Sequence, residues 1–195
     1  MLPDDVFAAK PMLIGQRVVL RPFEAADIEA MGPILADPEV LRLTGSVTTS
    51  RELEEARPEL GDRVREWYET RADQADRLDL AIIDREAGAC VGEVVLNDVR
   101  AAEEACNLRI LIGPAGRGRG LGTEAVRLIV DHAFATTSMN RISLDVLASN
   151  PRARRAYERV GFIQEGVLVD DVIFDGERED SVLMALLRRD WQRGR

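Results

Sequence analysis

The stretch GPAGRGRGLGTEAV (residues 113–126) is rich in glycine, carries Arg117 and Arg119, and runs directly into an apolar helical pattern. Glycine loses more backbone freedom on folding than any other residue, so this cluster indicates a loop where side chains would obstruct a ligand. A glycine loop that opens a helix also leaves N–H groups unpaired at the positive end of the helix dipole. The stretch therefore predicts an anion-binding site.

The composition is that of a soluble globular protein. The 195 residues are 46% hydrophobic and 31% charged, a length and balance that fit one domain spanning residues 1–195. No apolar run reaches membrane-spanning length, and the first residues are too acidic and too interrupted by proline for a secretory signal. We therefore expect a cytoplasmic protein with no membrane partner.

The charge pattern favours a small anionic ligand over a nucleic acid. A formal net charge of −9 disfavours nucleic-acid binding, because phosphate recognition draws on broad basic surfaces. Every basic residue except Lys10 is arginine, and arginines gather in the glycine loop and again at residues 150–162. Two local basic patches on an acidic protein suit a compact polyanion.

The cysteines and the histidine give no sign of a metal site. Cys90 and Cys106 lack paired spacing, so we expect buried free thiols. His132 is the only histidine and lies in the apolar-striped pattern after the glycine loop, where we interpret it as structural. We expect no metal.

Strand signals recur along the chain. β-Branched segments predict strands at residues 17–23, 77–84, 90–99, 106–113 and 141–147. Short turn-like or polar segments separate the second, third and fourth of these, which indicates an antiparallel meander.

Helical patterns alternate with these strands. Residues 24–35 have apolar side chains near one face, and residues 49–69 open with a capping-box spacing and are expected to break at Pro58. The helix after the glycine loop is predicted to begin near Gly122 or Thr123. An α+β domain with a mixed sheet is the consistent interpretation.

The last third of the chain has the clearest boundaries. The segment NPRARRAYERVGF (residues 150–162) predicts a helix with Asn150 as N-cap, Pro151 in the first turn and Gly161 as the stop. The sequence around Asp175-Gly176 predicts a hairpin that joins two strands.

The glycine loop resembles a known cofactor loop. Arg117, Gly120 and Gly122 fit the pattern R/Q-x-x-G-x-G/A, after a strand and before a helix, which resembles the acetyl-coenzyme A loop of the Gcn5-related N-acetyltransferases (GNAT). Residues 150–162 are similar to the second cofactor segment of that superfamily.

Both ends of the chain resemble one branch of the superfamily. Residues 165–191 are similar to the C-terminal hairpin of RimJ/RimL-like proteins, and residues 17–31 are similar to their first strand and helix. The resemblance implies a single domain with a mixed, mostly antiparallel sheet of about seven strands flanked by helices. It also implies that the sheet splays between the strands at 106–112 and 141–147.

The resemblance implies acetyl-coenzyme A as co-substrate and assigns residues to it. The glycine loop would bind the pyrophosphate, the main chain of strand 106–112 would bind the pantetheine arm, Asn150 would cap its helix and contact the cofactor, and Arg159 would reach the nucleotide phosphates. The assigned residues are Leu111, Ile112, Arg117, Gly118, Arg119, Gly120, Leu121, Gly122, Thr123, Asn150 and Arg159.

Two residues are candidates for proton transfer. Tyr157 matches the position of the general acid that protonates the departing thiolate of coenzyme A, with a packed helix tyrosine as the alternative. Asn107 stands where many RimJ/RimL-like proteins carry a glutamate, and an amide cannot accept the proton of the amine. Glu93 on the neighbouring strand is the candidate substitute, with a solvent-facing strand charge as the alternative.

The implied activity is direct transfer of acetyl from the thioester to a primary amine, in this branch a protein N-terminal amine. Two alternatives stay open: a small-molecule amine such as an antibiotic or a polyamine, and an acyl-coenzyme A sensor with little turnover. The resemblance also makes a homodimer a possible assembly.

Overall fold

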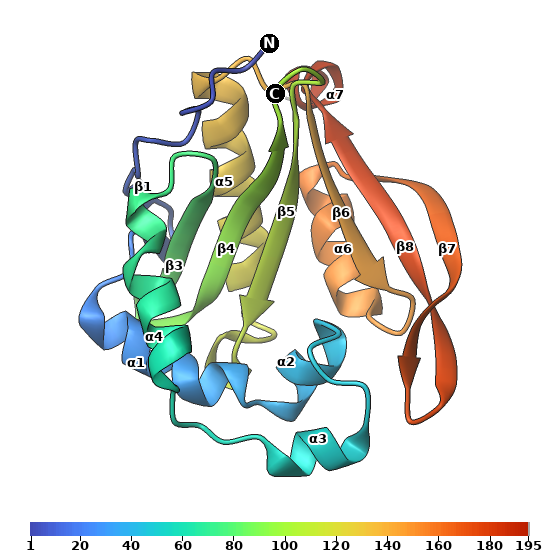
Figure 1. Cartoon of the computed structure of the whole chain (residues 1–195). Helices are drawn as coiled ribbons and strands as arrows, with labels where there is room; N and C mark the ends of the chain where they lie inside the picture. The colour runs from blue at the N-terminus through green and yellow to red at the C-terminus, as the bar shows by residue number, and fades with distance from the viewer. Residues whose placement is uncertain (195) are drawn as a thin grey trace.

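Eight strands form one mixed sheet in the computed structural model, which describes residues 1–194 (Figure 1). Their order across the sheet is β1-β2-β3-β4-β5-β6-β8-β7. The bounds are β1 Leu13–Ile14, β2 Val18–Arg21, β3 Leu78–Asp84, β4 Ala89–Arg100, β5 Ala105–Ile112, β6 Arg141–Leu147, β7 Ile163–Phe174 and β8 Glu177–Leu187. The strand beyond the expected seven is β1, a two-residue pairing with β2.

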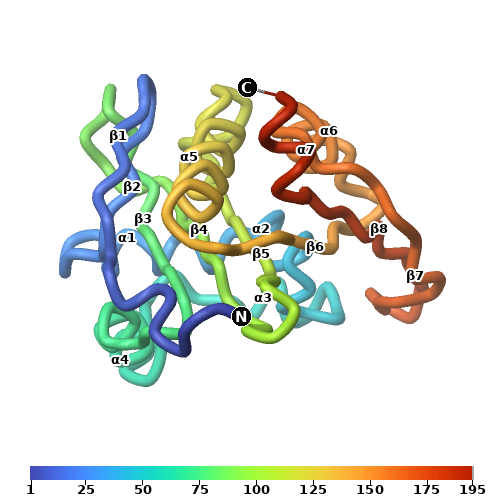
Figure 2. Tube along the Cα trace, turned by 90° about the horizontal axis from the view of Figure 1, so that it is seen from above, coloured from blue at the N-terminus to red at the C-terminus, as the bar shows by residue number. Residues whose placement is uncertain are grey.

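Helices cover both faces of this sheet. The α-helices are α1 Ala25–Leu35, α2 Pro38–Leu43, α3 Ser50–Glu55, α4 Asp62–Glu69, α5 Leu121–Thr136, α6 Pro151–Val160 and α7 Arg188–Arg193. Seen from above, α5 and α6 lie on one side of the sheet and α4 on the other (Figure 2). The larger buried cluster joins α5 to the sheet, and a smaller one gathers Met31 of α1, Val40 of α2 and Tyr68 of α4.

The predicted meander is present. Strands β3, β4 and β5 pair antiparallel in sequence order. Residues of β5 alternate between the two faces: Leu108 and Ile110 pack with the α5 cluster, and Leu111 packs with the α1–α4 cluster. A side chain of β4 or β6 that pairs with one of these residues lies on the same face of the sheet.

The splay of the sheet lies between β5 and β6, as the resemblance implies. These strands pair in parallel over only three positions: Ala105 with Arg141, Cys106 with Ile142 and Asn107 with Ser143. Beyond them β5 continues to Ile112 against β4, and β6 continues to Leu147 against β8, so the two strands diverge (Figure 1).

The glycine loop turns the chain into α5 where the sequence predicts. Gly120 is the N-cap with φ of 80°, and α5 begins at Leu121, so Gly122 and Thr123 lie in its first turn. A left-handed φ redirects the chain sharply, and glycine adopts it without a Cβ clash, so the helix begins directly after this residue.

The predicted boundaries of the last third are confirmed. Asn150 caps α6 by accepting a hydrogen bond from the Ala153 N–H at 3.0 Å, and Gly161 ends the helix with φ of 114°. Asp175 and Gly176 both have positive φ and join β7 to β8. The chain then adds α7, which the sequence did not predict, and its Trp191 ring packs on Phe134 of α5 at 5.4 Å.

Both cysteines are free thiols, as expected. Cys106 is buried, and burial raises its pKa to about 12. Cys90 is half-buried, and burial raises its pKa to about 11. Neither thiol is therefore ionised near neutral pH.

Replacing Gly161 tests the C-terminal boundary of α6. An alanine Cβ there would meet Leu186 at an ordinary 3.5 Å, so the penalty of Gly161→Ala comes from the φ of 114° alone. We expect the free energy of unfolding to fall by about 1–2 kcal/mol in urea denaturation. Gly61→Ser is the matched control, because Gly61 is an N-cap with φ of −67° and open space around its Cβ. Equal midpoints for the two variants would contradict this account.

Candidate active site

A cleft of about 560 Å³ opens where β5 and β6 diverge. Its walls come from α2, the glycine loop, the start of α5, and α6, and its floor comes from β5 and β6. The residues that line it include Glu39, Asp98, Arg109, Leu111, Ile112, Arg117, Gly118, Gly120, Gly122, Thr123, Asp145, Asn150, Arg152, Tyr157, Arg159 and Ser181. The structure therefore brings most of the predicted site residues to one cavity.

The glycine loop presents main chain to this cleft. Gly118 and Gly120 have φ of 72° and 80°, and no side chain caps the N-terminus of α5. A Cβ on Gly122 would lie 3.4 Å from Ile112 Cγ1, on the cleft lining, so a larger side chain would extend into the cavity. Uncapped N–H groups at the positive end of a 16-residue helix, beside glycines, form an arrangement that can bind an anion.

The loop arginines hold the loop in place. The Arg117 Nε donates to the Ile112 carbonyl at 3.0 Å, and its guanidinium forms ion pairs with Asp37 and Glu39 at the start of α2. The Arg119 guanidinium forms ion pairs with Asp84 and Glu86, away from the cleft. Arg117 thus links the loop to α2.

Two predicted loop residues have side chains outside the cleft. Arg119 and Leu121 line a second, charged depression with Arg17, Asp84 and Arg85. The Leu121 side chain is buried in the main core. These two residues therefore belong to the glycine loop through their main chain, and their side chains do not line the cleft.

The two predicted positions on β5 differ in the direction of their main chain. The Gly113 N–H donates to the Val91 carbonyl of β4 at 2.8 Å. Because N–H and C=O groups alternate in direction along a strand, Leu111 also points its main chain to β4, and Ile112 points its main chain into the gap. Ile112 is therefore the position able to offer an N–H to an extended ligand.

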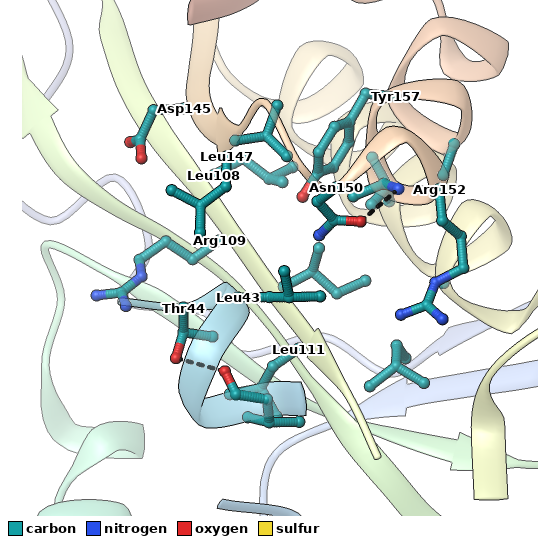
Figure 3. Close-up of a pocket in the computed structure, with 18 of the residues that line it drawn as sticks. Leu43, Thr44, Leu108, Arg109, Leu111, Asp145, Leu147, Asn150, Arg152 and Tyr157 are labelled. Atoms are coloured by element: carbon teal, nitrogen blue, oxygen red, sulfur yellow. Dashed lines mark hydrogen bonds between the residues drawn. The ribbon is translucent and has the colours of Figure 1, made fainter. Parts of the chain in front are cut away.

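Tyr157 lies at the centre of the cleft wall. Its ring packs near Phe162 at 5.9 Å, and its hydroxyl points into the cavity beside Asn150 (Figure 3). Within residues 1–194 no hydrogen bond to this hydroxyl is formed. Burial, together with the negative charge of Asp145, raises the pKa of Tyr157, so the phenol stays protonated near neutral pH.

Glu93 is buried behind the cleft, and the solvent-facing alternative is wrong. Its side chain is on the α1–α4 face, where it accepts a hydrogen bond from the Tyr68 hydroxyl, and its Oε2 has no hydrogen-bond partner. Burial raises the pKa of this carboxyl to about 7. Glu93 does not line the cleft, so its carboxyl would not contact an amine bound there.

The sequence interpretation missed Arg109 and Asp145. Both line the cleft, and Asp145 acts electrostatically on Tyr157. Asn107, the residue at the usual glutamate position, instead donates its amide to Asn97 at 3.2 Å. Period-2 alternation places Asp145 on the same face as Ser143, a signal that could have found it.

The remaining predicted residues divide between site and scaffold. Asn150 and Arg159 line the cleft, and the Arg159 side chain is exposed. His132 is half-buried in α5, outside the cleft, and burial lowers its pKa.

Among the described residues, no three His, Cys, Asp or Glu side chains group as a metal site would require. No helix in residues 1–194 has the length and apolar character to cross a bilayer.

Comparison with known proteins identifies the class. Residues 17–163 match the acetyltransferase (GNAT) domain family, so the chain belongs to this family. Membership confirms the resemblance and makes the protein an N-acetyltransferase with acetyl-coenzyme A as its co-substrate.

Relatives of two acceptor classes are similar to this chain. The [ribosomal protein uS5]-alanine N-acetyltransferase of Escherichia coli (strain K12) is 35% identical over 99 residues, covering 51% of this chain and 51% of that relative. The spermidine N(1)-acetyltransferase of Escherichia coli (strain K12) is 27% identical over 174 residues, covering 89% and 88%. The crystal structure of spermidine N-acetyltransferase from Vibrio cholerae in complex with CoA and spermine has a TM-score of 0.75 at 21% identity, covering 91% and 99%.

The buried Glu93 carboxyl makes a pH-dependent prediction. Its native pKa of about 7 lies above the ordinary value of 4.5, so its stabilising contribution is present below pH 4.5 and is lost as the pH rises towards 7. Glu93→Gln does not titrate. We expect urea denaturation to show this variant gaining about 2–3 kcal/mol relative to the native chain between pH 5 and pH 8.

The control for this measurement is Glu103→Gln, at an exposed turn residue. Its stability relative to the native chain should change little over the same pH range. If the Glu93 and Glu103 variants give parallel pH curves, Glu93 is not the buried, proton-binding carboxyl described above.

Proposed function

We propose that this chain transfers an acetyl group from acetyl-coenzyme A to the N-terminal amine of a protein. The observation that carries the proposal is one continuous cleft, which joins the uncapped N-terminus of α5 to the Tyr157 hydroxyl and then to the space under α2. An anion site, a proton donor and an open end for an amine are the parts that this transfer needs.

Main chain and a few side chains are proposed to bind the co-substrate. The N–H groups of residues 117–123 would hold the pyrophosphate, the Ile112 N–H would pair with an amide of the extended arm, and Arg159 would approach the nucleotide phosphates. The free edge of β5 supports this, since main-chain groups left open inside a sheet need partners.

Tyr157 is proposed as the proton donor. The bound co-substrate supplies an activated thioester. As the amine nitrogen bonds to its carbonyl carbon and the C–S bond breaks, the Tyr157 hydroxyl would give its proton to the thiolate that leaves, and the proton lost by the amine would pass through water and restore the phenol. Burial that raises the pKa of the phenol also disfavours a thiolate in the same cavity, so the proton transfer is less uphill than the phenol pKa alone would indicate.

Glu93 is proposed to act through its neighbours. The positive charge of Arg109 helps to stabilise the ionised Glu93 carboxyl, although burial is the larger influence on its pKa. Arg109 lines the cleft, so Glu93 would influence the charge of the cleft from behind its wall. This makes it a positioning residue rather than a group that touches the amine.

A small polyamine is the second candidate acceptor. The similarity to the spermidine N(1)-acetyltransferase of Escherichia coli (strain K12) spans 89% of this chain, a longer match than the 51% spanned by the ribosomal-protein relative. We also propose that the protein is a cytoplasmic homodimer. Exposed apolar side chains on the edge strand β7, including Ile163 and Val169, support an assembly.

The direct test is release of the coenzyme A thiol from acetyl-coenzyme A across N-terminal peptides and small amines. Turnover on peptides supports the first proposal, and turnover on polyamines alone supports the second. Cofactor binding measured in parallel, with no release from any amine, would contradict both proposals.

Tyr157→Phe tests the proton donor. We expect kcat to fall about 100-fold, because the phenyl ring keeps the packing and loses the proton. The dissociation constant of coenzyme A, measured by calorimetry, should change little. An unchanged kcat would leave Tyr157 as a packed tyrosine with no part in the reaction.

Gly122→Val tests the loop. Its side chain would project into the cleft without requiring a positive φ, so we expect weaker coenzyme A binding by 10-fold or more and a nearly unchanged melting temperature. Gly61→Val at the N-cap of α4, with open space around its Cβ, is the control. Unchanged binding in the folded Gly122→Val variant would contradict the proposed pyrophosphate position.

A further inference from the structure

The charges along the cleft are not distributed evenly. At the α2 wall, Glu39 is shared by Arg117 and Arg152, and Asp37 pairs with Arg117. At the floor, Arg109, Asp98 and Asp145 line the same cleft, and none of them forms an ion pair within residues 1–194. Unpaired charges in a cavity with walls of low dielectric constant act strongly on a ligand.

Arg109 and Asp145 flank the opening at equivalent positions. Each lies two residues beyond the last parallel pair, Asn107 with Ser143, Arg109 on β5 and Asp145 on β6. Both side chains therefore project from the same face of the sheet, on the two strands that separate (Figure 3). They carry opposite charges and do not form an ion pair with each other.

Ser181 adds a polar group with no partner. Its side chain is 1% exposed, it lines the cleft, and its Oγ has no hydrogen bond among the described residues. Ser181 of β8 pairs with Leu147, and Asp145 pairs with Leu183, so Ser181 and Asp145 are diagonal neighbours on one face. Buried hydroxyl groups are normally hydrogen-bonded, so this one indicates a ligand group.

We propose that the acceptor carries an anionic group beside its primary amine, with Asp145 and Ser181 binding the amine and Arg109 binding the anion. This rests on the proposed acetyl transfer and deepens it by naming the acceptor chemistry. Asp145 is the charged group that acts on Tyr157, which places the amine end towards the proton donor.

Two sources share this chemistry. One is a peptide whose N-terminal residue is followed by an acidic side chain, and the other is a free amino acid with its own carboxylate. A polyamine fits less well, because its second ammonium group would meet the guanidinium of Arg109. Glu93 behind Arg109 offsets this repulsion only in part, because its carboxyl is buried and partly protonated near neutral pH.

The native protein provides the first test. We would measure kcat/KM by thiol release for three peptides of equal length that differ only at the second residue, which is glutamate, glutamine or lysine. Spermidine, a free amino acid and the corresponding amino acid amide complete the set. We expect at least a 10-fold preference for glutamate over glutamine, or for the amino acid over its amide, and the weakest activity with lysine and spermidine.

Variants identify the groups responsible. Arg109→Gln should remove the preference for the anionic acceptor, so that kcat/KM for the glutamate and glutamine peptides becomes equal, and Arg109→Glu should reverse the preference. The matched control is Arg100→Gln, at an exposed residue of β4 outside the cleft. Asp145→Asn should lower kcat/KM at least 10-fold for every amine with unchanged coenzyme A binding, and Asp171→Asn on exposed β7 is its control.

The outcomes separate this inference from the function on which it rests. If no amine releases the thiol, the proposed transfer fails. If amines react but glutamate, glutamine and lysine peptides and the small amines show no preference for an anion, only the acceptor inference fails. Preference for spermidine would overturn it in favour of the polyamine class.

Discussion

The short parallel contact between β5 and β6 is the constraint on which the rest of this structure depends. Three residue pairs hold the two strands together, and each strand then follows its other neighbour, β4 on one side and β8 on the other. Because the antiparallel pairings on the two outer sides are longer than the shared one, the sheet opens rather than closing across the gap. The opening creates the cleft and leaves one edge of β5 free.

The glycine loop and its arginines give this opening a fixed shape. Positive φ at Gly118 and Gly120 turns the chain so that the N-terminus of α5 faces the cleft. Arg117 ties the loop to the Ile112 carbonyl and to α2, so side chains that the sequence suggests as phosphate ligands serve as links between elements. The anion site that we propose then depends on main-chain N–H groups, which no substitution of these arginines removes directly.

Much of the fold could be predicted from local signals and from the family resemblance. Asn150 and Gly161 define α6 through capping geometry, and the meander follows from strand periodicity and its separating turns. The start of α5 was predicted to within one or two residues, but the left-handed conformation of its N-cap, Gly120, could not be assigned to one glycine of the loop from the sequence.

The site was less predictable because its chemistry depends on partners far apart in sequence. Glu93 could be placed on a strand, but only the packing of Tyr68 shows that its carboxyl is buried. Asp145 and Ser181 belong to different strands, and their proximity follows from the β6–β8 register, which no local pattern contains. Spacing along a strand shows which of its residues share a face, and the register between strands shows which residues of the neighbouring strand lie beside them.

Amide hydrogen exchange on β5, with and without coenzyme A, tests the central claim most directly. The N–H groups of Ile110 and Ile112 point into the gap, whereas the N–H of Cys106, which points to the same side of β5, lies in the parallel contact with β6. Saturating coenzyme A should slow exchange at Ile110, Ile112 and residues 117–123, and should leave residues 105–107 nearly unchanged. Bound coenzyme A with no added protection at Ile110 and Ile112 would show that the divergence of β5 and β6 is not the cofactor site.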